Sequence, residues 1–125
     1  MIDHVSVAVR DLAAATKFYD ALLGALGYQR LDNRPHTVGW GKKYSDFWIN
    51  LRPNMSPVSP DSGVHICLRA ISKEAVNAFH AAALSSGGSS DGAPGPRKND
   101  DPRYYAAFIR DPDGNRIEAV TFLDA

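Results

Sequence analysis

Two histidines, His4 and His65, occupy the same place in two copies of an internal repeat, and no other side chains in the sequence have a more suggestive spacing. Each lies near the start of a stretch of alternating apolar residues, at 1–9 and 64–70. The same offset of 61 residues recurs further along the chain, where it pairs Phe18 with Phe79, Ala14 with Ala75, Ala21 with Ala82 and Gly27 with Gly88. A recurring offset of this kind indicates that one supersecondary unit is used twice.

The last strand of each copy carries one polar residue between apolar ones, Asn50 in the first copy and Glu118 in the second. Side-chain alternation turns both away from the face that a helix would cover, and His4 and His65 point away from that face too. We therefore expect the two copies to bring His4, Asn50, His65 and Glu118 towards one cavity. Two imidazoles and a carboxylate suit a divalent transition metal and leave positions open for water or substrate.

Less specific interpretations exist for each of these residues. A single strand histidine is more often a half-buried structural residue than a ligand, and only the equivalent placement of two favours ligation. Asn50 suits a weak ligand, a hydrogen-bond donor beside the metal or a pocket wall, of which the wall is favoured. Cys67 shares the face of His65 and suits a pocket-lining thiol, because nothing in the sequence indicates a lowered pKa. His36 and His80 lie in a turn and on a helix, as solvated or structural residues do.

Helical spacing of apolar residues predicts helices over 12–26 and 73–86, with Asp11 and Ser72 as N-caps. Alternation and turn residues predict the remaining strands at 28–31, 37–40, 46–51, 104–110 and 115–122. Each copy thus reads β-α-β-β-β, and we expect an α+β fold with a curved, mixed and mainly antiparallel sheet.

Two stretches lack this regularity. Residues 53–63, rich in proline, predict an extended linker between the copies. Residues 87–103 are rich in Gly, Ser, Pro, Asn and Asp, and predict a loop with at most a short strand near 89–92. We expect this loop to cover the cavity and to become ordered when substrate binds.

Composition narrows the class of protein. The 125 residues suit one compact domain, and their formal net charge of zero argues against charge-driven binding to nucleic acid or a membrane surface. No apolar run is long enough to span a bilayer, and the N-terminus lacks a signal-peptide core. A single cysteine excludes an intrachain disulfide. We expect a cytoplasmic protein.

Several stretches resemble the vicinal oxygen chelate superfamily, which includes glyoxalases, bleomycin-resistance proteins and extradiol dioxygenases. They are Ile2-Asp-His-Val-Ser-Val7 with Asp11-Leu12, Phe18-Tyr19 with Leu26-Gly-Tyr28, Val64-His-Ile66, and Phe108-Ile-Arg-Asp-Pro-Asp-Gly-Asn-Arg-Ile-Glu118. The resemblance implies a single glyoxalase-like domain of two paired βαβββ modules, module one at 1–52 and module two at 64–125. It also implies His4, His65 and Glu118 as ligands of a divalent metal (Fe, Mn, Ni or Zn). Asn50 then stands where glyoxalase I often has a glutamate.

The resemblance implies a metal-dependent enzyme that acts on a small oxygenated organic substrate by bidentate chelation. Loss of one glutamate removes a candidate base and disfavours lactoylglutathione isomerisation. The remaining ligands resemble those of extradiol dioxygenases (Fe²⁺) and fosfomycin-type thiol transferases (Mn²⁺). We expect Glu118 and Tyr105 to be catalytic, with Tyr104 as the other candidate acid/base. We expect the substrate pocket to include Asn50, Trp48, Cys67 and Tyr104.

The alternative is a metal-free module of the bleomycin-resistance type that sequesters a small ligand. Aromatic residues suit stacking on such a ligand, and the candidates are Trp40, Trp48, Tyr104, Tyr105 and Phe108. Both histidines are present, however, which favours the enzyme. A module of about 55 residues is too small to bury its own sheet well, so we expect a homodimer whose modules pair within or between chains.

Overall fold

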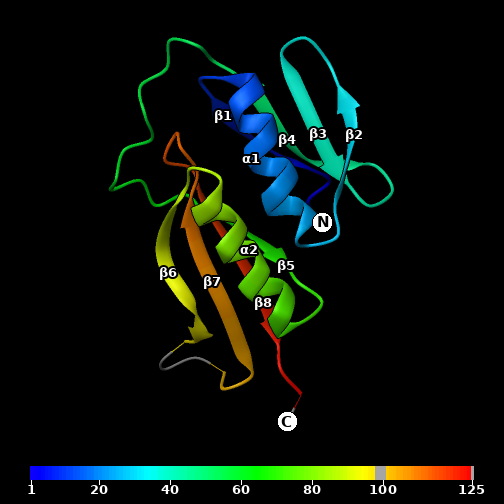
Figure 1. Ribbon diagram of the computed structural model, residues 1–125, viewed down its shortest axis with the longest axis vertical. Helices are drawn as coiled ribbons and strands as arrows, with labels where there is room; N and C mark the ends of the chain where they lie inside the picture. Colours follow the sequence, from blue (N-terminus) through cyan, green and yellow to red (C-terminus); the bar gives the residue numbers. More distant parts are fainter. Residues whose placement is uncertain (98–100, 125) are drawn as a thin grey trace.

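Two βαβββ modules make up the computed structural model, which describes residues 1–97 and 101–124 (Figure 1). Module one contains β1 (Val5–Val9), α1 (Leu12–Gly24), β2 (Gln29–Asn33), β3 (Thr37–Gly41) and β4 (Ser45–Leu51). Module two contains β5 (Ile66–Arg69), α2 (Lys73–Ser85), β6 (Ser89–Pro96), β7 (Tyr104–Arg110) and β8 (Arg116–Phe122). The predicted α+β architecture of two paired modules is confirmed.

Each module forms its own four-stranded sheet, and the strand order is the same in both. The orders are β1-β4-β3-β2 and β5-β8-β7-β6. The first strand of each module pairs in parallel with the last, and the other neighbours pair antiparallel. The sheets are therefore mixed and mainly antiparallel, as expected from the internal repeat.

Both helices begin where the sequence predicts, and they end at Gly24 and Ser85, slightly before the predicted ends at 26 and 86. The side chains of Asp11 and Ser72 accept hydrogen bonds from backbone amides three residues on, at 3.0 and 3.1 Å. Gly27 and Gly87 follow the helices with φ of 85° and 100°, a left-handed conformation that favours glycine and ends a helix.

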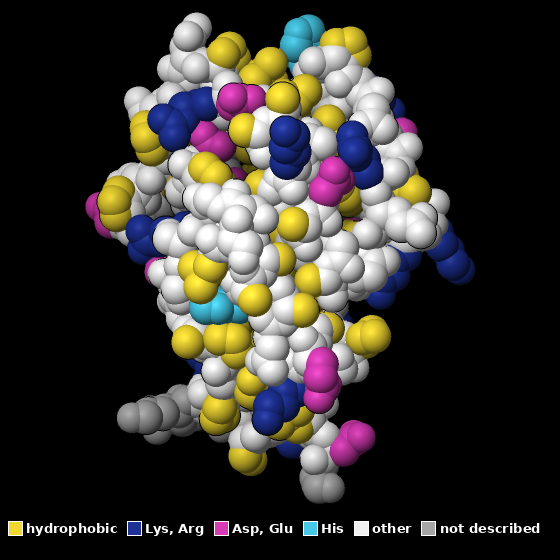
Figure 2. Space-filling view, viewed as in Figure 1, with side chains coloured by type: hydrophobic (Ala, Val, Ile, Leu, Met, Phe, Trp, Pro, Cys, Tyr) yellow, Lys and Arg dark blue, Asp and Glu magenta, His cyan; other side chains and the backbone are white. Residues whose placement is uncertain are grey.

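Each helix covers one face of its sheet (Figure 1) and supplies the apolar core beneath it. From α1, Phe18, Tyr19 and Leu22 are buried, and the Tyr19 ring packs 5.1 Å from that of Phe47. Phe79 is the fully buried aromatic residue of α2. Acidic and basic side chains are interspersed on the outside of the helices (Figure 2). The opposite sheet face, which we call the open face, carries polar and aromatic side chains.

The turn between β7 and β8 joins the two modules. The Tyr19 hydroxyl donates to Asp111 at 2.6 Å, and Arg10 donates from Nε to Asp113 at 2.7 Å. Asn115 donates from its side chain to a β1 carbonyl at 2.8 Å. Asp111 also accepts hydrogen bonds from the backbone amides of Asp113 and Asn115. The turn between β7 and β8 therefore holds the two modules together.

Two predictions about strand extent are wrong. The first strands begin at Val5 and Ile66, so His4 and His65 lie just before them. Residues 89–96 form the edge strand β6 rather than mostly a loop. Its proline and glycine residues are tolerated because the strand lies at an edge and its pairing with β7 is irregular near Gly92.

The structure describes only part of the stretch 87–103, which is predicted to cover the cavity. Residues 98–100 of that stretch lie outside the described residues, and its ordering on substrate binding stays a prediction. Within 1–97 and 101–124, no helix is both long and apolar enough to cross a membrane.

Candidate functional site

A buried carboxylate lies on the open face of module two. Glu118, on β8, is only 1% exposed, although alternation turns it away from α2. Nε2 of His65 lies 3.0 Å from Oε1 of Glu118, and the Tyr104 hydroxyl donates to Oε2. The structure thus brings together three residues that the sequence analysis selected, from β7, β8 and the segment before β5.

Cys67 borders this group, because it lies opposite Glu118 in the pairing of β5 with β8. Partial desolvation of the sulfur, followed by the nearby charge of Glu118, raises the pKa of Cys67 to about 12. Desolvation, followed by the hydrogen bond to Glu118, also raises the pKa of Tyr104. Both side chains are therefore protonated at neutral pH, and Tyr104 acts as a neutral hydroxyl donor.

His4 lies on the other module. Its Nδ1 is 2.7 Å from Oδ2 of Asp3, which leaves Nε2 as the atom able to coordinate a metal. It borders a cavity of about 400 Å³ on the open face of module one, together with Asp3, Ser6, Arg34, Thr37, Ser45, Trp48 and Asn50. His4 and His65 also border a separate groove of about 340 Å³ between the modules, beside Cys67.

A single chain does not assemble the four-residue cluster expected from the sequence. Asn50 shares a cavity with His4, while Glu118 contacts His65. Among residues 1–97 and 101–124, no three His, Cys, Asp or Glu side chains are placed to hold one metal ion. The chain therefore keeps His4 with Asn50 on one open face and His65 with Glu118 on the other.

The strand register corrects the position that Asn50 occupies. With His4 aligned to His65, Ser6 of β1 is equivalent to Cys67 of β5. Cys67 pairs with Glu118, but Ser6 pairs with Trp48. Trp48, and not Asn50, is thus the counterpart of Glu118, and matching by polar residue alone was wrong by two positions.

The predicted catalytic position of Tyr105 is also wrong, because its side chain does not lie on the open face. Tyr105 is 7% exposed and donates from its hydroxyl to Asn77 of α2 at 2.6 Å. It therefore points to the helix-covered face, because neighbouring residues of a strand alternate between faces. Trp40 is similarly part of the core, with its indole N–H donating to Asp20 at 2.9 Å. Of the tyrosine pair, only Tyr104 lies beside Glu118.

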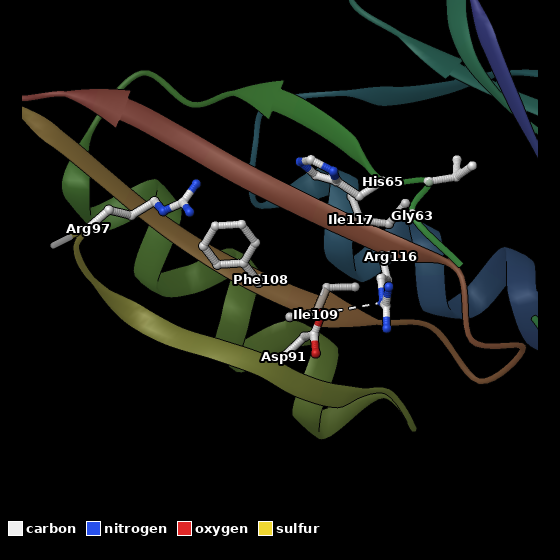
Figure 3. Close-up of a pocket in the computed structure, with 9 residues that line it drawn as sticks. Gly63, His65, Asp91, Arg97, Phe108, Ile109, Arg116 and Ile117 are labelled. Carbon is white, nitrogen blue, oxygen red and sulfur yellow. Dashed lines mark ion pairs between the residues drawn. The ribbon is translucent and has the colours of Figure 1, made fainter. Parts of the chain in front are cut away.

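A third cavity, of about 240 Å³, adjoins His65 on module two and is drawn in Figure 3. In that view the Phe108 ring lies between Arg97 and His65, and the Arg97 guanidinium carbon is 5.5 Å from the ring centre. Arg116 donates to the carbonyls of Pro60 and Ser62 and so anchors the linker beside the cavity. The sequence analysis missed these arginines, because only the strand register reveals which aromatic residues lie near them.

Comparison with known proteins agrees with this architecture. A family model described as the glyoxalase/bleomycin resistance protein/dioxygenase superfamily matches residues 1–119. No curated protein matches the chain. A solved glyoxalase/bleomycin resistance protein from Albidiferax ferrireducens T118 is 37% identical with a TM-score of 0.80, over 94% of this chain and 95% of that one.

Two more distant structures share the fold. A glyoxalase/bleomycin resistance protein/dioxygenase family enzyme from Burkholderia phytofirmans PsJN is 20% identical with a TM-score of 0.72, over 98% of each chain. The fosfomycin resistance protein FosX from Mesorhizobium loti is 16% identical with a TM-score of 0.69, over 97% of this chain and 91% of that one. The chain belongs to the glyoxalase/bleomycin resistance protein/dioxygenase superfamily.

Proposed function

We propose that the protein is a metal-dependent enzyme in which His65 and Glu118 of module two, with His4 of module one, hold one divalent metal ion. The observation that carries this proposal is the buried carboxylate of Glu118 with an imidazole nitrogen 3.0 Å away on an open sheet face. Nitrogen and oxygen donors of this kind suit iron, manganese, nickel or zinc.

The two donor atoms fit a shared ion. His65 Nε2 and Glu118 Oε1 lie 3.0 Å apart, within hydrogen-bond distance, so both atoms could bind the same ion if it replaced the shared proton. Asp3 holds the opposite nitrogen of His4, as the partner of a metal-binding imidazole does. These contacts support His65 and Glu118 of module two as two of the ligands, and at least one more would be needed.

We infer that a second copy completes it. In a homodimer, the open face of module one in one chain would cover the open face of module two in the other. This would add His4 to His65 and Glu118. Aromatic side chains on both faces support the pairing, including Trp48, Tyr104 and Phe122, the last of which is 40% exposed.

A bound metal would supply Lewis-acid polarisation and orient a small substrate that chelates through two oxygen atoms. The chain's own residues would do the rest. Tyr104, a neutral donor to Oε2 of Glu118, is placed to hold or transfer a proton at that oxygen. Trp48 would form a wall of the substrate cavity on the facing module and exclude water.

A second candidate, a metal-free binding protein, is favoured by one observation. Module one has Trp48 where module two has Glu118, so this position supports stacking rather than ligation. The two candidates predict opposite results when metal is measured.

The test is metal content and affinity of protein purified without chelator, followed by titration with Fe²⁺, Mn²⁺, Ni²⁺ and Zn²⁺. We expect one ion per chain, and at least tenfold weaker binding in His65→Ala and Glu118→Gln. His80→Ala is the matched control, because His80 bonds to Ser90 at 2.8 Å, away from the open face. Unchanged binding in Glu118→Gln would refute the proposed site, and no binding by the parent would favour the metal-free candidate.

A further inference from the structure

An arginine is stacked on a tryptophan in the cavity of module one. The guanidinium carbon of Arg34 lies 4.9 Å from the centre of the Trp48 ring. Among residues 1–97 and 101–124, no carboxylate forms an ion pair with Arg34. A guanidinium has five N–H donors in a planar fork. Here a ring supports one face of that fork, and no carboxylate of the described residues forms an ion pair with it.

Contacts with β3, β4 and the turn between β2 and β3 hold this pair in the sheet. Trp48 lies across Gly39 of β3, where an added Cβ would come within 2.9 Å of the indole ring. The indole N–H donates to the Ser45 carbonyl at 3.1 Å. The Arg34 amide donates to the Thr37 carbonyl at 2.9 Å and closes the turn between β2 and β3. The indole and the backbone of Arg34 are therefore held in place before any ligand binds.

The cavity offers a guanidinium and neutral hydrogen-bond donors to an anion. Its other charged side chain, Asp3, lies 2.7 Å from Nδ1 of His4 and forms no ion pair with Arg34. Thr37 and Asn50 add a hydroxyl and an amide that can donate hydrogen bonds. The Ser45 hydroxyl is occupied, since it donates to Asp32 at 2.5 Å. Among the described residues, Arg34 is thus the arginine of this cavity, and no carboxylate forms an ion pair with it.

We propose that Arg34 and Trp48 form an oxyanion-binding site, which takes the carboxylate or phosphate group of a small organic ligand. The planar fork of arginine matches both groups in a bidentate arrangement. Stacking on Trp48 orients the fork and reduces its hydration. The claim that the enzyme's substrate is anionic rests on the function proposed above. The claim that this site binds an anion does not.

Metal-free protein, stripped with a chelating resin, separates these two claims. We would titrate ¹⁵N-labelled protein with benzoate, with phenylphosphonate and with neutral benzyl alcohol, and follow the Arg34 Nε–H and Trp48 indole signals. We expect both anions to bind at least tenfold more tightly than the alcohol. Tighter binding of benzoate would indicate a carboxylate site, and tighter binding of phenylphosphonate a phosphate or phosphonate site. Equal binding of anions and alcohol would overturn the proposal.

Variants assign the effect to Arg34. Arg34→Gln should abolish the preference for anions, and Arg34→Lys should retain part of it, because lysine keeps the charge but not the fork. Arg52→Gln is the control, since Arg52 is exposed and donates to the neighbouring Leu51 carbonyl. An unchanged preference in Arg34→Gln, with the buried Trp40 signal showing a native fold, would also overturn the proposal.

Trp48 is a positioning residue for Arg34 and needs a separate test. Trp48→Leu should weaken anion binding with little effect on the alcohol, and Trp48→Phe should restore part of it by returning a ring. Because no metal is present, loss of anion preference and loss of metal binding are read independently. If Arg34 instead pairs with an acidic residue of a second copy, Arg34→Gln would weaken the dimer and the parent would show no anion preference, which refutes the site.

Discussion

The open faces of the two modules have the same strand order but different side chains at one equivalent position. Module two has the carboxylate of Glu118 there, in contact with His65 and Tyr104, whereas module one has the indole of Trp48, stacked under Arg34. Glycines Gly39 and Gly92 make room for Trp48 and Phe108 on the neighbouring strands. The repeat thus supplies one scaffold, and its two copies differ at this position, with a carboxylate in one and an indole in the other.

Mixing two defective chains would test this division most strongly. His4→Ala and His65→Ala should each bind little metal alone. If sites form across chains, a mixed dimer has one complete site. Random pairing makes about half of the dimers mixed, so binding should return to about half a metal ion per dimer on average. The measurement is bound metal after the two variants are mixed, unfolded and refolded together. If each chain builds its own site, mixing would restore nothing.

A second prediction makes the modules alike. Trp48→Glu places a carboxylate opposite Ser6, as Glu118 lies opposite Cys67. We expect it to tighten metal binding by at least tenfold, since it adds an anionic ligand, and to weaken anion binding at Arg34. Asn50→Glu is the matched control and should change metal affinity little. If Asn50→Glu tightens metal binding and Trp48→Glu does not, Asn50 is the position equivalent to Glu118.

The glycines offer a test of packing in both modules. Gly39→Ala brings a Cβ within 2.6 Å of the Ser45 hydroxyl, and Gly92→Ala within 2.8 Å of the Phe108 ring. Each should lower the free energy of unfolding by about 1–3 kcal/mol. Gly95→Ala is the control in β6, because nothing lies within 4 Å of its Cβ position. Denaturant unfolding measures all three, and equal effects at Gly95 and Gly92 would contradict the packing.

The smallest expected effect concerns the joint between the modules. Tyr19→Phe removes one hydrogen bond to Asp111 and keeps the packing of the ring on Phe47. We expect a loss of about 1–2 kcal/mol in the free energy of unfolding, because Asp111 keeps its other donors. Thermal or denaturant unfolding measures it. An unchanged midpoint would show that this hydrogen bond contributes nothing to holding the modules together.

Local physics explains why much of the fold was predictable. Asp11 and Ser72 are N-caps because their side chains accept amide hydrogen bonds a few residues away, and the repeat of His4 with His65 is legible in sequence. The same alternation that placed Glu118 on the open face distinguishes Tyr104 from Tyr105 once the strand's orientation is known. By contrast, β6 was predicted mostly as a loop, because its Ser, Gly and Pro residues lack strand propensity and depend on pairing with β7.

By itself, the sequence determined the two modules, their helices, their strands except β6, and the candidate residues His4, His65 and Glu118. Only the tertiary structure decided which side chains meet, because the register between β1 and β4 is set by pairing across the sheet rather than by neighbours along the chain. That register places Trp48, not Asn50, opposite Ser6 and brings Arg34 over its ring. It also leaves His4 on a different open face from Glu118, since each βαβββ module closes its own sheet before the two modules pack together.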